Sequence, residues 1–161
     1  MSNVIFRRAT NRDRELAQRI VDGALREHGL GVVLDAGDVD LTDLERHYEG
    51  RGGRFEIIEE PDGTALGVIG WRLASAEQCE LKKLYLVAAA RGRGLGRLAI
   101  DRVVAAARSL GCRSIVLETA AVLDRANRLY LRAGFVPARG AAAGPFATLT
   151  DQCDLAYRLE L

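Results

Sequence analysis

Two periodicities of hydrophobic residues succeed one another along the chain and predict its secondary structure. Apolar residues that alternate with polar ones, or a short apolar run between turn residues, predict a strand. Stretches of this kind cover residues 3–8, 54–59, 65–73, 79–87, 114–119, 135–138 and 155–161. Apolar residues spaced by three and four predict an amphipathic helix. This second pattern covers residues 14–28, 41–48, 96–110 and 123–133.

Turn and capping residues mark several boundaries between these elements. Thr10 with Asp13 resembles a helix start, so the first helix is expected directly after them. Residues 61–63, Pro-Asp-Gly, predict a tight turn that joins two strands into an antiparallel hairpin. Residues 29–40 and 139–147 show no clear period and predict loops.

Two of the predicted helices reveal the face that they bury. On the first helix, one face carries Leu16, Ile20, Val21 and Leu25. On the helix over residues 96–110, the residues expected to face the sheet are Leu98, Val103, Ala107 and Leu110. Gly111 is a suitable residue to end that helix.

Composition and length predict a single globular domain over residues 1–161. The chain is 48% hydrophobic and 28% charged, and a chain of this size buries about two-thirds of its unfolded surface. No internal repeat or linker is visible. The N-terminus lacks the apolar run of a secretory signal, and no run of about 18 apolar residues follows. We therefore expect a cytoplasmic protein that does not bind membranes.

Charge and cysteine usage argue against two further classes of protein. The formal net charge is +1, so no overall field attracts nucleic acid, and an anion must be held by a local site. Cys79, Cys112 and Cys153 are widely separated and only two histidines accompany them, which predicts no metal site. The cysteines are expected to be small buried thiols, and a substrate-lining role for Cys79 stays open.

A turn rich in glycine and arginine, residues 91–97 (Arg-Gly-Arg-Gly-Leu-Gly-Arg), leads from a strand into a helix. Unpaired N–H groups at a helix N-terminus bind anions, and glycines let the anion approach the backbone. A dinucleotide-binding turn is excluded because Arg97 fills the last glycine position, and a nucleotide P-loop is excluded because no Lys-Ser/Thr follows. The sequence of residues 91–97 therefore predicts either a phosphate-binding site or a tight turn whose glycines are needed only for its backbone conformation.

The pattern Arg91-x-x-Gly94-x-Gly96 resembles the Gln/Arg-x-x-Gly-x-Gly/Ala signature of the GNAT superfamily of N-acetyltransferases. Two flanking segments also resemble family segments, in the family's order: residues 80–86 (Glu-Leu-Lys-Lys-Leu-Tyr-Leu) and residues 126–135 (Ala-Asn-Arg-Leu-Tyr-Leu-Arg-Ala-Gly-Phe). The resemblance runs from about residue 55 to residue 138 and so covers the central part of the chain.

The resemblance implies both a fold and an activity. The fold is of the α/β (α+β) class, with a central mixed, mostly antiparallel sheet of six to seven strands, splayed between strands 4 and 5 and flanked by about four helices. The activity is transfer of an acetyl group from acetyl-CoA, the cosubstrate, to a primary amine of a small molecule, amino acid or peptide. Direct attack in a ternary complex is expected, because no motif places a cysteine as acyl carrier. A longer acyl group and a homodimer, frequent in the family, stay open.

In the family the turn holds the coenzyme pyrophosphate, and the backbone of the preceding strand binds the pantetheine arm. The matching residues here are Leu84, Leu86, Arg91, Gly92, Arg93, Gly94, Leu95, Gly96, Arg97, Asn127 and Tyr130. The chain departs from the family pattern at Ala88, where proline is frequent, and at Leu123, where many members have an asparagine that touches the coenzyme. Asn127 is assigned in its place, although its side chain points elsewhere on the helical wheel.

Three catalytic roles follow from the resemblance. The Leu84 N–H is expected to polarise the thioester carbonyl as an oxyanion-hole donor. Glu80 matches the position of a general-base glutamate that acts through water, and a structural ion pair with Lys82 is the alternative. Tyr130 matches a tyrosine that reprotonates the coenzyme thiolate, and a core role is its alternative.

The acceptor is expected between residues 29–52 and 139–151, by analogy with the family. The first of these segments carries acidic residues that either attract a cationic amine or belong to a solvated loop: Asp35, Asp38, Asp40, Asp43 and Glu45. His47, Trp71 and Arg72 are candidate lining residues, and Arg72 is suited to clamp a substrate carboxylate. The competing functions are an inactive acetyl-CoA sensor or partner module, and a nucleic-acid-binding protein that uses the arginine-glycine turn.

Overall fold

A computed structural model describes residues 3–144 and 152–161 of the chain. The chain forms two compact units. The first unit comprises Met1–Arg72 and Lys83–Gly96, and the second comprises Leu73–Lys82 and Arg97–Leu161. The prediction of a single domain is not tested by this division and stays a prediction.

Seven strands form one mixed sheet in the order β1-β2-β3-β4-β5-β7-β6. Their bounds are β1 Ile5–Arg8, β2 Arg54–Glu59, β3 Ala65–Ser75, β4 Gln78–Leu86, β5 Ser114–Thr119, β6 Val136–Pro137 and β7 Leu155–Glu160. β4 and β5 run parallel, whereas β1–β2, β2–β3, β5–β7 and β6–β7 are antiparallel pairs. The mixed, mostly antiparallel sheet expected from the sequence is confirmed.

Four α-helices are present among the described residues, as the sequence predicts. They are α1 Arg14–Arg26, α2 Leu44–His47, α3 Leu95–Ser109 and α4 Asp124–Arg132. The predicted second helix is divided in two, because a short 3-10 helix at Val39–Thr42 precedes α2. Asp43 lies between this 3-10 helix and α2 and has a non-helical backbone conformation. Its side chain accepts the Arg46 N–H and so caps the start of α2.

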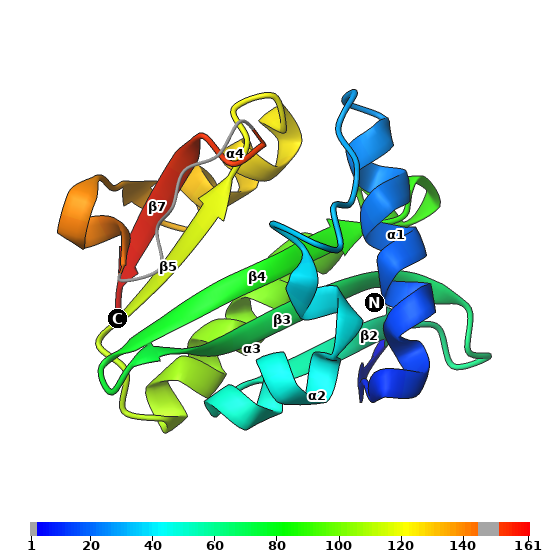
Figure 1. The fold of residues 1–161 in the computed structure, drawn as a ribbon, viewed down its shortest axis with the longest axis horizontal. Coiled ribbons are helices and arrows are strands. Elements are labelled where there is room, and N and C mark those ends of the chain that lie inside the picture. Colours follow the sequence, from blue (N-terminus) through cyan, green and yellow to red (C-terminus); the bar gives the residue numbers. More distant parts are fainter. Residues whose placement is uncertain (1–2, 145–151) are drawn as a thin grey trace. The chain divides into compact units, whose positions relative to one another are not determined.

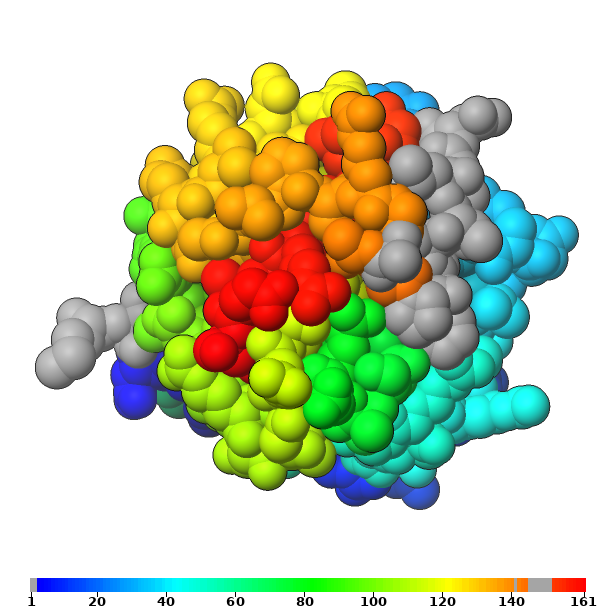
Figure 2. Space-filling model, turned by 90° about the vertical axis from the view of Figure 1, so that its left-hand side faces the viewer, coloured from blue at the N-terminus to red at the C-terminus, as the bar shows by residue number. Residues whose placement is uncertain are grey.

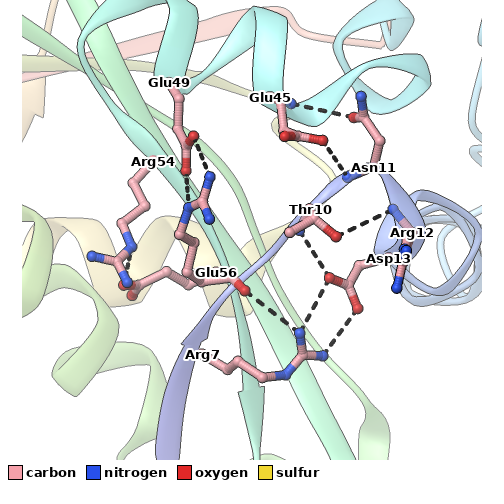
Figure 3. Close-up of polar contacts among 10 residues, drawn as sticks. Arg7, Thr10, Asn11, Arg12, Asp13, Glu45, Glu49, Arg54 and Glu56 are labelled. Atoms are coloured by element: carbon pink, nitrogen blue, oxygen red, sulfur yellow. Dashed lines mark hydrogen bonds and ion pairs between the residues drawn. The ribbon is translucent and has the colours of Figure 1, made fainter.

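The 3-10 turn Asn11–Asp13, which leads into α1, is fixed by side-chain hydrogen bonds that Figure 3 shows in close-up. Thr10 and Asp13 form a capping box around this turn, in which the Thr10 backbone N–H donates to the Asp13 carboxylate and the Thr10 hydroxyl oxygen accepts a backbone N–H of the turn. Asp13 also binds the Arg7 guanidinium at 3.0 Å. Asn11 donates its backbone N–H to Glu45 at 3.0 Å, and this bond ties the entry of α1 to α2.

The first unit has its core between α1, α2 and the strands β1 to β3. α1 buries the apolar face that the sequence predicts, with Ala17, Ile20, Val21 and Leu25 buried and Leu16 half-buried. α2 lies beside β2, as Figure 1 shows. Gln18 on α1 donates its amide to the Leu41 carbonyl at 2.9 Å, so the segment before α2 is fastened to α1.

The second unit is built on the antiparallel pair β5–β7, drawn yellow and red in Figure 1. Six residue pairs join the two strands, from Ser114–Glu160 to Thr119–Leu155. The Leu161 N–H donates to the Arg113 carbonyl at 3.0 Å, so the end of the chain adjoins the turn that follows α3. Figure 2 views this face, with β7 in red beside that turn in yellow-green.

The predicted buried face of α3 is half wrong. Val103 and Ala107 are fully buried as expected, but Leu98 and Leu110 are 44% and 43% exposed. The residues that α3 buries instead are Leu95, Ala99 and Ile100. In the set that they form with Val103 and Ala107, each residue lies three or four positions from another, the spacing of one helical face, and two of the five are small alanines.

Within the described parts of the chain, we find no helix with both the length and the apolar character needed to span a bilayer.

Candidate functional site

The turn between β4 and α3 has the backbone of an anion-binding loop. After a 3-10 helix at Ala88–Ala90, Gly92 and Gly94 both adopt a left-handed conformation with φ of 78°. A Cβ atom at either position would meet no other atom within 4 Å, so the glycines are required by conformation and the space above them is open. α3 begins at the buried Leu95, and its first N–H groups have no partner within the helix. Alternating left-handed residues followed by a helix N-terminus form a concave set of N–H donors.

The three arginines of the turn each face a carboxylate. Arg91 Nη1 lies 2.6 Å from Glu27 Oε2 at the end of α1, and its Nη2 donates to the Leu86 carbonyl at 3.1 Å. Arg93 pairs with Glu60 at 2.8 Å. The Arg97 pair with Asp101, at 2.9 Å, is exposed and lies within α3. The guanidinium groups of the turn thus make contacts within the chain, and the backbone N–H groups are the candidate anion donors.

β4 departs from regular strand geometry at Lys83. Its φ is 58°, and no other non-glycine residue of the described ranges has a positive φ. The parallel ladder with β5 comprises three residue pairs and ends at Glu80–Val116, although β4 continues to Leu86. A left-handed residue within a strand acts as a bulge, which ends pairing and redirects the backbone groups that follow.

The backbone of β4 after Lys83 presents alternate residues to β3. Val87 donates its N–H to the Leu66 carbonyl at 2.9 Å. Because backbone groups alternate in direction along a strand, the N–H and C=O of Leu84 and Leu86 point away from β3. The Leu86 carbonyl accepts the Arg91 guanidinium. The oxyanion role expected for the Leu84 N–H stays a prediction.

Gly67 allows β3 and β4 to lie unusually close at this point. A Cβ atom on Gly67 would stand 2.5 Å from the Tyr85 carbonyl oxygen and 2.6 Å from Leu86 Cδ2. No side chain fits there without moving the backbone of β4. Gly67 therefore fixes the position of the segment that carries Leu84 and Leu86.

The Lys83 side chain ends in a buried cluster of Lys83, Asp38, Asp40 and Tyr48, which we call the Lys83 cluster. The Lys83 side chain is 9% exposed, and its Nζ lies 2.7 Å from Asp38 Oδ1 and 3.4 Å from Asp40 Oδ1. The Tyr48 hydroxyl donates to the second oxygen of Asp40. Burial by itself lowers the pKa of Lys83, but the charges of Asp40 and Asp38 outweigh burial, so the pKa is raised and the ammonium persists.

The acidic residues of the segment before β2 have partners within the chain. Asp38 and Asp40 belong to the Lys83 cluster. Asp43 caps α2 and accepts the Asn11 amide at 3.0 Å, and Glu45 accepts the Asn11 N–H. Of the five acidic residues, Asp35 is exposed and the other four make hydrogen bonds or ion pairs within the chain. The two interpretations of the segment, attraction of a cationic amine and a solvated loop, are not tested by these contacts.

The three residues proposed for the acceptor pocket lie in the first unit. Trp71 and Arg72 are buried on β3, and His47 is half-buried at the end of α2. Burial lowers the pKa of His47, and the charges of Arg51, Arg46 and Arg72 lower it further while Asp40 opposes them. His47 and Arg72 are thus within electrostatic reach of each other and of the Lys83 cluster.

Glu80 lies in the second unit, on the part of β4 that pairs with β5. The residue is 7% exposed, and its Oε1 stands 4.0 Å from Lys82 Nζ. That distance is long for a hydrogen-bonded ion pair. Both roles expected for Glu80, the general base and the structural ion pair with Lys82, stay predictions.

Tyr130 and Asn127 both point into the second unit from α4. The Tyr130 ring is 5% exposed and packs against Phe135 and Tyr157, with ring centroids 5.8 and 6.1 Å away. The Asn127 amide donates to the Ala120 carbonyl at 3.0 Å and to the Ala121 carbonyl at 3.3 Å. Asn127 therefore holds the β5–α4 connection, and a coenzyme contact would involve its remaining oxygen.

Other predicted positions are described only in part. Cys79 and Cys112 are buried and Cys153 is half-buried, and burial raises the pKa of the Cys112 thiol. Leu123 occupies the N-cap position of α4 and makes no side-chain cap, and the coenzyme contact expected to be lost there stays a prediction. Of the second acceptor segment, residues 139–151, the part from 145 to 151 lies outside the described residues.

The first unit contains the turn from Arg91 to Gly96, Leu84, Leu86 and the acceptor candidates, while the second contains Glu80, Asn127, Tyr130 and Arg97. The sequence analysis missed the role of Lys83 and of Tyr48. A signal was present, because Lys82 and Lys83 place two charges in succession and so break the alternation of apolar and polar residues along the strand.

Comparison with known proteins adds to this geometry. Residues 24–135 match the family described as the acetyltransferase (GNAT) family. An uncharacterised N-acetyltransferase of Escherichia coli K12, YjgM, is 32% identical over 138 residues, which cover 81% of each chain.

Two solved structures share the fold. An acetyltransferase of the GNAT family from Staphylococcus aureus Mu50 superposes with a TM-score of 0.89 at 18% identity, covering 98% of both chains. The structure of yncA from Salmonella typhimurium, determined with its cofactor acetyl-CoA, gives a TM-score of 0.69 at 22% identity. It covers 98% of this chain and 93% of its own.

Proposed function

The chain belongs to the acetyltransferase (GNAT) family and is an N-acetyltransferase, and from this premise we propose its reaction. It transfers an acetyl group from acetyl-CoA to a primary amine of a small molecule, amino acid or peptide, by direct attack in a ternary complex. The observation that carries the proposal is the left-handed pair Gly92 and Gly94 at the start of α3, directly after the kinked strand β4.

The residues of the first unit suit a coenzyme. The open space above Gly92 and Gly94 and the N–H groups at the start of α3 fit a pyrophosphate. The Leu84 and Leu86 backbone faces away from β3 and is suited to the amide groups of the pantetheine arm. When bound, acetyl-CoA supplies an acyl group activated as a thioester. The Salmonella protein yncA was solved with that cofactor, which supports the same choice here.

The Leu84 N–H would donate to the thioester carbonyl oxygen, where negative charge develops during attack. A preorganised donor of this kind contributes about 3 kcal/mol to the transition state. The left-handed Lys83 directs this N–H before any substrate arrives, so little reorganisation is needed.

Glu80 and Tyr130 would move the protons. A primary amine has a pKa near 10.4 and is mostly protonated at neutral pH, so it must lose a proton before it attacks. The Glu80 carboxylate accepts that proton, directly or through water, and the Tyr130 hydroxyl returns one to the departing sulfur. The C–S bond breaks as the C–N bond forms, and the products are an acetylated amine and a free thiol.

The charges around the acceptor candidates favour an amine that also carries a carboxylate. Arg72 is buried on β3, and its charge contributes to lowering the pKa of the half-buried His47. A guanidinium recognises a carboxylate through paired, charge-assisted hydrogen bonds. Amino-acid-like acceptors are therefore the first to test.

Calorimetry with acetyl-CoA, followed by thiol release with a panel of amines, tests the proposal. We expect binding, and turnover that is fastest with amines bearing a carboxylate. Gly94→Ala provides a matched variant that should weaken binding, and Gly23→Ala, on the exposed side of α1, is the control. Binding without turnover on any amine would favour an acetyl-CoA sensor, and no binding would remove both functions.

A further inference from the structure

Lys83 combines two features that rarely occur together in a strand. Its backbone is left-handed, with φ of 58°, although lysine has a Cβ atom and no short polar side chain to stabilise that conformation. Its side chain is buried and ends in two ion pairs, to Asp38 and Asp40. A bulge re-aims the side chain of the bulged residue, so the backbone kink and the side-chain anchor depend on each other.

The two carboxylates are themselves held in place by the segment before α2. Asp38 accepts the Val33 N–H at 2.9 Å through the oxygen that does not face Lys83. Asp40 is 2% exposed and accepts the hydroxyl of Tyr48. Residues 33–40 therefore present both carboxylates to one ammonium as a rigid pair.

Tyr48 connects this arrangement to the core of the first unit. It is fully buried, and its ring meets Phe55 edge-on with a centroid distance of 4.9 Å. A Cβ atom on Gly70 would stand 2.5 Å from Tyr48 Cε1, so the ring lies directly on β3. The Lys83 cluster is thus connected to β3 through Tyr48. Through Asp38 and Asp40 it is connected to residues 29–52, which we call the acceptor segment.

We propose that Lys83 is a positioning residue, which couples the acceptor segment to the acyl-transfer site through its ion pairs with Asp38 and Asp40. The ammonium holds β4 in the left-handed kink, and the kink directs the N–H of the next residue, Leu84, away from β3. The inference rests on the oxyanion role of Leu84 in the proposed function. Displacement of residues 33–40 relaxes the kink and reduces kcat, with little effect on coenzyme affinity.

A pair of variants separates this role from simple structural support. Lys83→Ala and Lys83→Gly both remove the ammonium, but only glycine adopts a φ near +60° without strain. We expect kcat to fall at least tenfold in Lys83→Ala and to be at least fivefold higher in Lys83→Gly than in Lys83→Ala. The Kd for acetyl-CoA is expected to change less than threefold in both. Arg26→Ala, which removes an exposed cation from α1, is the control.

Equal kcat values in the alanine and glycine variants, or an unreduced kcat in Lys83→Ala, would overturn the proposal. Asp38→Asn covers the case in which Lys83→Ala does not fold, because it keeps the shape of the side chain and weakens one ion pair. We expect its kcat to fall at least threefold with acetyl-CoA affinity retained, and an unchanged kcat would overturn the coupling.

An NMR measurement tests the left-handed backbone of Lys83 without any enzyme turnover. Failure of the proposed function can therefore be distinguished from failure of the inference about Lys83. A left-handed residue gives a strong NOE between its own amide and Hα protons. We expect this signal for Lys83 in the wild type and its weakening in Asp38→Asn, together with a shift of the Leu84 amide. Loss of acetyl-CoA binding or turnover in the wild type would refute the proposed function. An unaltered Lys83 signal in Asp38→Asn would instead refute the role of Lys83 as a positioning residue.

Discussion

Replacing Gly67 with alanine places a methyl group against the backbone of β4. The added carbon would lie 2.5 Å from the Tyr85 carbonyl oxygen and 2.6 Å from Leu86 Cδ2, so β3 and β4 must separate by several tenths of an ångström. Leu86 Cδ2 can rotate away, but the carbonyl is backbone and can move only with the strand. The change therefore acts on the strand that carries the proposed oxyanion donor.

Overpacking of this kind costs about 1–3 kcal/mol of unfolding free energy. For a chain of this length each kcal/mol shifts Tm by about 2–4 °C, so we expect Tm to fall by roughly 2–12 °C. Gly23→Ala is the matched control. Gly23 lies on α1 with no atom near its missing Cβ, and alanine there should raise stability by up to about 1 kcal/mol.

Differential scanning calorimetry measures the stability of both variants, and isothermal titration with acetyl-CoA measures whether the displaced strand still binds the coenzyme. We expect Gly67→Ala to lower both Tm and affinity. An unchanged Tm in Gly67→Ala, beside a rise in Gly23→Ala, would refute the close approach of β3 and β4 and the reasoning built on it.

Three further predictions concern single residues. Tyr130→Phe should lower kcat much more than coenzyme affinity and leave Tm nearly unchanged, because the ring contacts to Phe135 and Tyr157 remain; an unchanged kcat would remove the acid role. Gly94→Ala should weaken acetyl-CoA binding about tenfold, since alanine at φ of 78° carries about 1–2 kcal/mol of strain; equal affinity by calorimetry would contradict this. His47→Gln should reduce the loss of stability on acidification. Burial lowers the pKa of His47 in the folded state below 6.5, so the stability that neutral His47 contributes above pH 6.5 is lost as the pH falls below that value. Urea unfolding at several pH values measures this dependence.

Much of the fold follows from local sequence signals. The strands at residues 54–59 and 114–119 have the bounds that the hydrophobic pattern predicts, because each contains β-branched and other apolar residues in strand spacing and follows a glycine within three residues. The coenzyme turn is equally local, since Gly92 and Gly94 must be glycine for conformational reasons. Such features are set by a few neighbouring residues and can be read without tertiary information.

The errors arise at positions where tertiary packing, rather than local sequence, determines which residues are buried or paired. Leu98 and Leu110 are apolar and helical, yet they lie off the face defined by the smaller Ala99 and Ala107, which permit close packing. The partners of Lys83 are separated from it by more than 40 residues, and no periodic pattern records that pairing. A buried ion pair needs its desolvation cost offset by geometry, which only the folded chain provides.

The Lys83 cluster also affects which side-chain amines of the chain can be acylated. Lysine occurs only twice, at positions 82 and 83, and the remaining permanent side-chain cations are arginines, which thioesters do not acylate at neutral pH. Lys83 is buried in its ion pairs and stays protonated, so its nitrogen has no lone pair with which to attack an acyl donor. Lys82 is therefore the side-chain amine through which acetyl thioesters, or amine-reactive labels, would modify the described chain.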